Sequence, residues 1–109
     1  MEVREYVDEL GRSRYGRWFG DLEISTRARV EIAVTRLGLG NLSNIKSVGE
    51  GVTELRMDFG PGFRAYFGRD GDRLILLLGG GTKQGQQNDI KLARAAWRAY
   101  KRRKAAGEI

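Results

Sequence analysis

The stretch GVTELRMDFGPGFRAYF, residues 51–67, decides the fold of this chain, because it predicts two short strands joined by a turn at Gly60-Pro61-Gly62. Apolar residues occupy alternate positions on both sides of this turn: Leu55, Met57, Phe59, Phe63, Ala65 and Phe67. Successive side chains of a strand point to opposite faces of a sheet, so this apolar set is expected to face the core. The alternate set, with Arg56, Arg64 and Tyr66, is expected to share one solvent-facing surface.

The expected outer surface of this hairpin suits an anionic ligand. A guanidinium group offers a planar fork of donors that matches phosphate oxygens, and it stays charged at any working pH. Phosphate is therefore the first candidate ligand for Arg56 and Arg64. A solvated sheet face with cross-strand Glu–Arg pairs explains the same pattern equally well.

The composition indicates a single globular domain that spans residues 1–109. The chain has 109 residues, of which 40% are hydrophobic, enough for one modest core. Lys and Arg number 20 against 14 Asp and Glu, which gives a net charge of +6. Such a basic domain is expected to attract polyanions: nucleic acid, an acidic protein segment or an anionic membrane.

The chain contains no cysteine and no histidine, which excludes several kinds of site. Disulfides, thiolate zinc sites and nucleophiles activated by histidine are all excluded, so catalysis would have to use Lys, Arg, Tyr or carboxylates. We expect no metal and no cofactor. No apolar run is long enough to span a bilayer and residues 1–11 lack the hydrophobic segment of a signal peptide, so the cytoplasm is the expected location.

The remaining sequence predicts helices on either side of the hairpin. Apolar residues at helical spacing predict Arg12–Leu22, Ser25–Leu37 and Gln86–Lys104 as helices. The first two form a helical hairpin over one side of the sheet, and Ser25 or Thr26 can cap the second. Residues 1–10 fit a strand and a helix equally well.

Two loops and a buried strand complete the expected fold. Residues 41–50 carry turn-forming residues and predict a loop that contains Lys46. The fully apolar run Leu74–Leu78 predicts a strand covered on both faces, and the glycines 79–81 predict a loop before the last helix. That loop lacks the order and spacing of a nucleotide P-loop.

The last helix combines an apolar arc with a basic one. Ile90, Ala93, Trp97 and Tyr100 form the apolar arc. The candidate substrate-binding residues of the basic arc are Arg94, Arg98 and Lys101. A basic amphipathic helix of this kind binds nucleic acid, lies on a membrane surface or simply faces water.

Two blocks of the sequence, residues 40–67 and 76–93, resemble the addiction-module toxins of the RelE/ParE superfamily, and within it the HigB-like killer-protein branch. The matching motifs are Gly40-Asn41, Lys46, Glu54-Leu55-Arg56, Gly60 to Phe67, Gly80-Gly81, Lys83, Gln86 and Asp89-Ile90. The pair Trp18-Phe19 also falls where that branch has it, so the resemblance covers nearly the whole chain. Thr82, where the branch usually has Asp, and Ala65, in place of a larger β-branched residue, depart from it.

The resemblance implies an α+β fold: an N-terminal strand near residues 2–7, a helical hairpin, a curled antiparallel β-sheet and a C-terminal helix. It also implies the toxin of a type II toxin–antitoxin system, an mRNA endoribonuclease that commonly works in the ribosomal A site. The implied partners are mRNA, the ribosome and a cognate antitoxin that holds the toxin inactive. No membrane partner is implied.

RNA cleavage without a metal proceeds by attack of a 2′-hydroxyl on the adjacent phosphate, and cations fixed around the phosphate stabilise the transition state. Arg56 and Arg64 are the expected stabilising cations. Lys83 adds a third cation or gives a proton to the leaving 5′-oxygen, and Lys46 approaches from the opposite loop. Removal of Arg64 is expected to abolish activity and to leave the fold intact.

The general base stays open at the level of the sequence. Lys46 or Lys83 is favoured, while Tyr66 and Glu54 are alternatives, the latter as a base or only as the group that orients an arginine. Tyr66 could instead stack on a splayed RNA base. Gln86 is expected to hydrogen-bond the substrate or to cap the last helix.

Two other functions compete with RNA cleavage. ParE-type toxins of the same superfamily poison DNA gyrase without RNA chemistry, and a fold alone cannot separate these activities. A non-catalytic nucleic-acid binder that uses the basic helix is the third possibility, and it predicts salt-dependent binding without cleavage.

Overall fold

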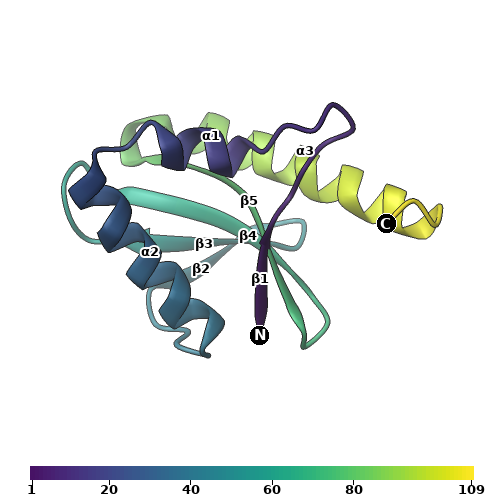
Figure 1. Ribbon diagram of the computed structural model, residues 1–109, viewed down its shortest axis with the longest axis horizontal. Coiled ribbons are helices and arrows are strands. Elements are labelled where there is room, and N and C mark those ends of the chain that lie inside the picture. The colour runs from purple at the N-terminus through teal and green to yellow at the C-terminus, as the bar shows by residue number, and fades with distance from the viewer.

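The computed structural model describes all of residues 1–109 and shows an α+β fold in which helices cover both faces of a five-stranded sheet (Figure 1). The strands are β1 (Glu2–Glu5), β2 (Ile45–Gly49), β3 (Val52–Met57), β4 (Phe63–Asp70) and β5 (Leu74–Thr82). The helices are α1 (Arg14–Gly20), α2 (Ile24–Gly38) and α3 (Gln86–Ala105), with a short 3₁₀ turn, η1 (Lys83–Gly85), before α3. The predicted order of elements is confirmed.

The sheet is curled and mixed, with the strand order β1-β5-β4-β3-β2. Strands β2 to β5 form antiparallel pairs with their neighbours, whereas β1 pairs in parallel with β5 through Glu2 to Glu5. The N-terminal segment, ambiguous from its own pattern, is therefore a strand.

The hairpin of β3 and β4 matches the sequence prediction in its register. Leu55 lies opposite Ala65 and Met57 lies opposite Phe63, so the apolar set shares one face. The turn requires glycine, because Gly60 and Gly62 adopt φ angles of 56° and 79°, which side chains disfavour.

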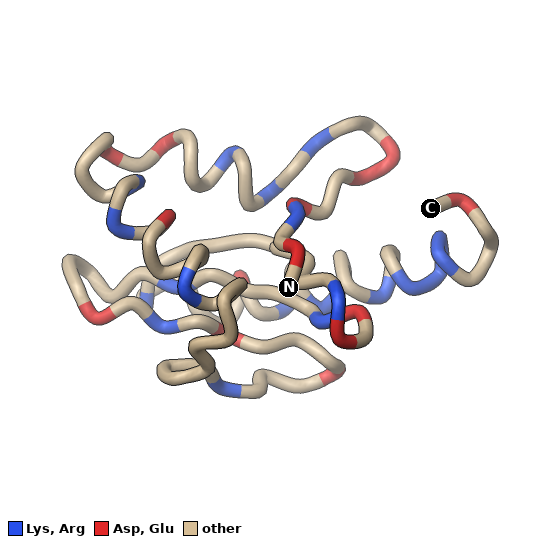
Figure 2. The backbone as a smooth tube through the Cα atoms, turned by 60° about the horizontal axis from the view of Figure 1, so that its bottom comes forward, with Lys and Arg blue, Asp and Glu red and all other residues tan.

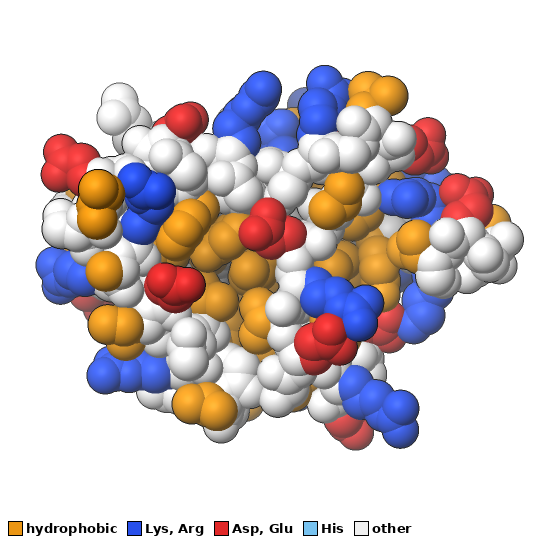
Figure 3. Space-filling view, in the orientation of Figure 1, with side chains coloured by type: hydrophobic (Ala, Val, Ile, Leu, Met, Phe, Trp, Pro, Cys, Tyr) orange, Lys and Arg blue, Asp and Glu red, His pale blue; other side chains and the backbone are white.

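The first of two apolar cores, the α1–α2 core, lies between this face of the sheet and helices α1 and α2. It is formed by buried side chains of all three layers: Tyr15, Val30, Val34, Leu37, Leu55, Met57, Ala65, Phe67, Ile75 and Leu77. In the space-filling view, apolar side chains gather in a hollow in the middle of this side of the molecule (Figure 3).

The second core, the α3 core, lies on the opposite face of the sheet beneath helix α3. It contains Val52, Tyr66, Leu76, Leu78, Ile90, Ala93, Trp97 and Tyr100. Since β5 contributes alternate side chains to both cores, its apolar run is buried on two faces as predicted. The expected apolar arc of the last helix is confirmed as well.

Three local predictions are wrong. Residues 41–50 are not all loop, because Ile45 pairs with Leu55 and starts strand β2. The glycines 79–81 belong to strand β5, and helices pack closely on two of them: a Cβ on Gly80 would overlap the ring of Trp18, and a Cβ on Gly81 would overlap the carboxylate of Asp89. Helix α2 starts after Glu23 without a side-chain cap, so neither predicted capping residue is used.

Helix α3 runs past the edge of the sheet, and Lys and Arg residues follow one another along its C-terminal half (Figure 2). None of the three α-helices has an apolar stretch that would let it cross a membrane.

Candidate functional site

The candidate site lies on the sheet face that also carries α3, next to the start of that helix. Arg56 and Arg64 are direct partners in the β3–β4 register, so both side chains lie on one face, as strand parity predicted. Lys46 is the direct partner of Glu54 one strand further out, which adds it to the same face. We call the residues Lys46, Arg56, Arg64 and Lys83 the cationic face.

Arg64 is fixed by a buried carboxylate. Glu54 is completely buried, and one of its oxygens forms an ion pair with Nε of Arg64. The Nη1 atom of Arg64 also donates to the Gly62 carbonyl oxygen over 2.8 Å. The expectation of a solvent-facing Arg64 is therefore wrong, because only 9% of the residue is exposed. Glu54 orients an arginine, which was one of its predicted roles.

Gln86, the first residue of α3, completes this buried arrangement. Its Nε2 atom donates to Oε1 of Glu54 over 3.0 Å. The cap of α3 is Gly85, and no side chain bonds the first turn, so the predicted capping role of Gln86 is wrong. Arg64 is thus fixed by Glu54 of β3 and by Gly62 of the turn, and Gln86 of α3 in turn binds Glu54.

Tyr66 does not face solvent, contrary to the sequence prediction. Helix α3 covers it completely, and its hydroxyl has no hydrogen-bond partner in the protein. Burial raises the pKa of the Tyr66 phenol well above its usual value, and the negative charge of Glu54 raises it further. Tyr66 is therefore unsuited to act as a general base near neutral pH or to stack on an RNA base.

Lys83 meets Arg64 at the turn of the hairpin. The backbone N–H of Lys83 donates to the Gly62 carbonyl oxygen over 3.0 Å, the same atom that binds the Arg64 guanidinium. The side chains of Lys46, Arg56 and Lys83 are exposed. Three free cations thus surround one cation that is held rigidly.

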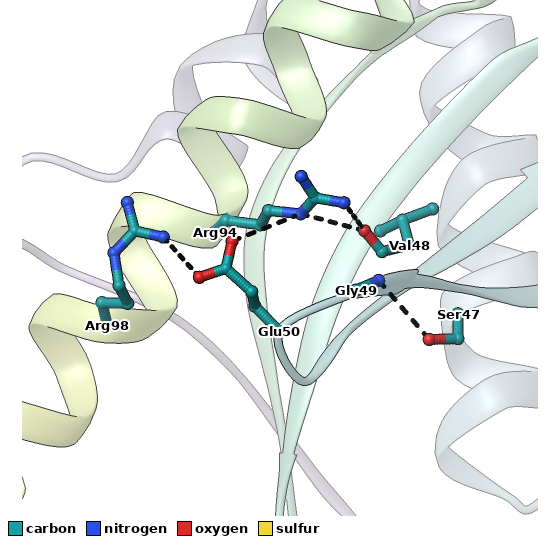
Figure 4. Close-up of polar contacts among 6 residues, drawn as sticks. All are labelled: Ser47, Val48, Gly49, Glu50, Arg94 and Arg98. Carbon is teal, nitrogen blue, oxygen red and sulfur yellow. Dashed lines mark hydrogen bonds and ion pairs between the residues drawn. The ribbon is translucent and has the colours of Figure 1, made fainter.

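The predicted substrate-binding arginines of α3 contact the turn between β2 and β3 instead (Figure 4). Arg94 donates from Nε to the Val48 carbonyl oxygen over 2.9 Å, and a Cβ on Gly49 would come within 2.7 Å of its Nη2 atom. Arg98 donates from Nη1 to Oε1 of Glu50 over 2.9 Å.

These contacts connect α3 to the end of β2 and the turn that follows it. Glu50 lies 3.7 Å from Arg94 as well, and a Cβ on Gly51 would lie 2.6 Å from Nε1 of Trp97. Lys101 is exposed, with its ammonium 5.9 Å from the Trp97 ring centre. The structure therefore does not bring the basic arc of α3 to the cationic face.

One comparison with known proteins places the chain in a family. It is 38% identical over 81 residues to an uncharacterized protein of Haemophilus influenzae, a match that covers 73% of this chain and 82% of that protein. The chain belongs to that protein's family. No model of a described protein family matches the chain.

The name of this relative indicates no chemistry, so the residues themselves must indicate it. No three His, Cys, Asp or Glu side chains lie close enough together to hold a metal ion. The cationic face offers guanidinium and ammonium groups, a combination that binds phosphate oxygens.

Sequence reasoning missed a second feature, a cavity of about 600 Å³ between α1, β5 and α3. Three arginines that precede or belong to α1 line it, together with Asp89 of α3. The only signal in the sequence was the run of glycines 79–81, which leaves this end of β5 without side chains.

Proposed function

We propose that this protein is the toxin of a type II toxin–antitoxin system and that it cleaves mRNA on the translating ribosome, in the cytoplasm. The observation that carries the proposal is the preorganised Arg64. Its guanidinium is held by Glu54 and by the Gly62 carbonyl oxygen, directly opposite Arg56 and beside Lys83. Cations that are fixed before the substrate binds stabilise a developing charge most effectively.

Cleavage follows from the arrangement of these groups around one phosphodiester. The ribose 2′-oxygen attacks phosphorus, the bond to the 5′-oxygen breaks, and the products are a 2′,3′-cyclic phosphate and a 5′-hydroxyl. Arg56 and Arg64 bind the non-bridging oxygens, on which negative charge accumulates in the transition state.

The two lysines lie on either side of these arginines and can carry the protons. Lys46 belongs to β2 and Lys83 follows β5, three strand spacings or roughly 14 Å apart across the sheet. Lys46, in its neutral form, accepts the proton of the 2′-hydroxyl, and Lys83 donates a proton to the leaving 5′-oxygen. This assignment gives each lysine one role.

The buried Glu54–Arg64 pair favours a nuclease over a gyrase poison or a passive binder. A binding surface gains little from a guanidinium that is nine-tenths buried, because an exposed arginine attracts a polyanion equally well. A catalyst gains from a cation that does not have to reorganise during the reaction.

The charge of the chain supports an antitoxin as the partner. A net charge of +6 suits an acidic segment that folds as it binds. Such a segment would neutralise the toxin by covering the exposed Lys46, Arg56 and Lys83.

The test is a translating extract supplied with a defined message, in which RNA ends are mapped after addition of wild-type protein or Arg56→Ala. Arg56 is exposed, so its removal leaves the fold intact while cleavage falls by about 100-fold or more. Arg73→Ala is the matched control and should cleave normally, because Arg73 is an exposed arginine in the turn just before β5.

An intact message in the presence of the wild-type protein would contradict the proposal. If purified gyrase then accumulated cleaved DNA in the presence of the protein, poisoning of DNA gyrase would replace RNA cleavage as the proposed function. Full activity of Arg56→Ala would remove the cationic face from the site.

A further inference from the structure

The cavity between α1, β5 and α3, of about 600 Å³, is lined by none of the four residues of the cationic face. Basic residues form its rim on one side: Arg12, Arg14 and Arg17. In the space-filling view, Lys and Arg side chains stand over α1 and the segment before it (Figure 3). Trp18 and Asp89 line the interior, and the cavity is large enough for one nucleotide.

The floor of the cavity is an open edge of the sheet. Strand β1 pairs with β5 only as far as Leu77, where Tyr6 makes the last backbone hydrogen bond. From Gly79 onward, β5 pairs with β4 and with no other strand. Trp18 packs against the backbone of Gly80, and Asp89 packs against the backbone of Gly81.

The rim offers cations that the protein does not use. Arg12 forms an ion pair with Asp8, whose backbone contacts to Leu10 and Arg12 hold it in a turn. Arg14 and Arg17 are exposed and form no ion pair. Two unpaired guanidinium groups on one helix, at i and i+3, can bind one phosphate group together.

Asp89 gives the opposite wall a hydrogen-bond acceptor. A Cβ on Gly81 would overlap its carboxylate, so the side chain lies against the β5 backbone. Burial raises the pKa of Asp89 above its usual value, while the charge of Arg14, which lines the same cavity, opposes this change. A ligand that fits both walls carries an anionic group at one end and N–H donors at the other.

One strand pairing connects the surroundings of the cavity to the cationic face. Gly81, against which Asp89 packs, is the register partner of Arg64 on β4. Asp89 and Gln86 both lie in the first turn of α3, and Gln86 contacts the Glu54 that holds Arg64. A chain of nucleotides bound at Arg64 therefore reaches the cavity within about one nucleotide.

We propose that this cavity binds the nucleotide next to the cleaved phosphate of an RNA substrate, with its phosphate on Arg14 and Arg17 and its base edge on Asp89. The inference rests on the proposed RNA-cleaving function and adds a source of sequence preference to it. A carboxylate accepts hydrogen bonds from the amino groups of adenine, cytosine and guanine, whereas the N3–H of uracil lies between two carbonyl oxygens that repel a carboxylate. The site therefore selects against uridine at one position beside the cut.

The first test measures binding of fluorescein-labelled single-stranded hexamers of adenosine, cytidine or uridine to the full chain. The wild-type protein binds the uridine hexamer about tenfold more weakly than the other two. Asp89→Asn removes this difference, because an amide both donates and accepts. Arg14→Ala and Arg17→Ala each weaken all three hexamers and reduce the salt slope by about 0.7, whereas Arg73→Ala changes neither.

The second test maps cleavage sites in the translating extract, so that failure of this inference differs from failure of the proposed function. If the wild-type protein cleaves and Asp89→Asn accepts uridine at one position beside the cut, the inference holds. If it cleaves and Asp89→Asn keeps the wild-type preference, the inference is wrong and the proposed function stands. If hexamer binding depends on Arg14, Arg17 and Asp89 but no message is cleaved, the proposed function fails while the nucleotide site remains. The site would be overturned by an acidic hexapeptide that displaces the hexamers and that binds Arg14→Ala and Arg17→Ala as tightly as it binds the wild-type protein.

Discussion

The two faces of the sheet differ in what their helices cover. The face toward α1 and α2 buries apolar side chains that form one core with these helices. The face toward α3 is apolar only beneath the helix, and it becomes charged where the helix begins. The difference shows that polar alternation along a strand does not by itself indicate a solvent-facing surface.

The change from apolar to charged side chains on the α3 face has a chemical consequence. Tyr66 and Glu54 are completely buried there and Arg64 nearly so, while Arg56, the direct register partner of Arg64, stays exposed. One arginine of the pair is thus structural and preorganised, and the other is free to meet a ligand.

The largest effect is expected for Arg64→Ala. It leaves the buried Glu54 without its cation, so the free energy of unfolding should fall by about 3 kcal/mol or more. The sequence alone predicted an intact fold for this variant, and the structure gives a different expectation. Urea denaturation measures the change.

The control for this prediction is the double variant Glu54→Gln/Arg64→Met, which removes both charges. It should recover most of the lost stability, because no uncompensated charge remains buried. An Arg64→Ala protein as stable as the wild type would show that the two faces do not differ in this way.

The second prediction compares neighbouring glycines on opposite sides of β5. A Cβ on Gly80 would overlap the Trp18 ring on the α1 side, whereas a Cβ on Gly79 meets no atom within 4 Å. Gly80→Ala should therefore lower the free energy of unfolding by about 1–3 kcal/mol. Gly79→Ala should change it by less than about 0.5 kcal/mol or raise it slightly. Equal losses in thermal denaturation would contradict the different packing of the two sides.

The third prediction concerns the far end of α3 and depends on pH. Lys104 lowers the pKa of Asp70 by a direct hydrogen bond, and the Tyr100 hydroxyl, which donates to Oδ2 over 2.6 Å, lowers it further. A carboxylate with a lowered pKa stabilises the fold above its unfolded pKa, and this contribution is lost as the pH falls through the folded value. Asp70→Asn should cost about 1 kcal/mol at pH 7, and the difference from wild type should shrink as the pH falls below about 4 and vanish below the lowered pKa of Asp70.

Asp89→Asn is the matched comparison at the other end of α3. Burial raises the pKa of Asp89, so its ionised form opposes folding at neutral pH and protonation relieves this cost as the pH falls. The substitution should not destabilise the protein at pH 7. A pH-independent loss in both variants would contradict the opposite signs.

The smallest effect is expected for Arg98→Ala. Arg98 forms an ion pair with Glu50 in which about half of each side chain is exposed, and exposed ion pairs contribute little to stability. The free energy of unfolding should change by less than about 0.5 kcal/mol. A loss above 1 kcal/mol would show that this contact, and not the apolar arc, holds α3 on the sheet.

Local pattern predicted much of this fold. The alternation in β3 and β4 predicted the hairpin and its core face, and the unbroken run in β5 predicted burial on two sides. The apolar arc of α3 was also readable, because Ile90, Ala93 and Trp97 follow helical spacing.

What the sequence could not predict depends on contacts between distant elements. The burial of Tyr66 and Arg64 depends on where α3 crosses the sheet, and the alternation within the hairpin does not show that crossing. The glycines 79–81 by themselves predict a loop. In the structure they extend strand β5, with Trp18 of α1 packed on Gly80 and Asp89 of α3 packed on Gly81. The short strand β2 was hidden among turn-forming residues.

The most direct test of the central claim is the cleavage rate of the Glu54→Gln/Arg64→Met variant on a defined message in a translating extract. The variant is expected to be folded, so the rate reports on the preorganised cation alone. We predict a rate at least about 100-fold below that of the wild type. A rate equal to that of the wild type would contradict the claim that Arg64, fixed by Glu54, stabilises the transition state of RNA cleavage.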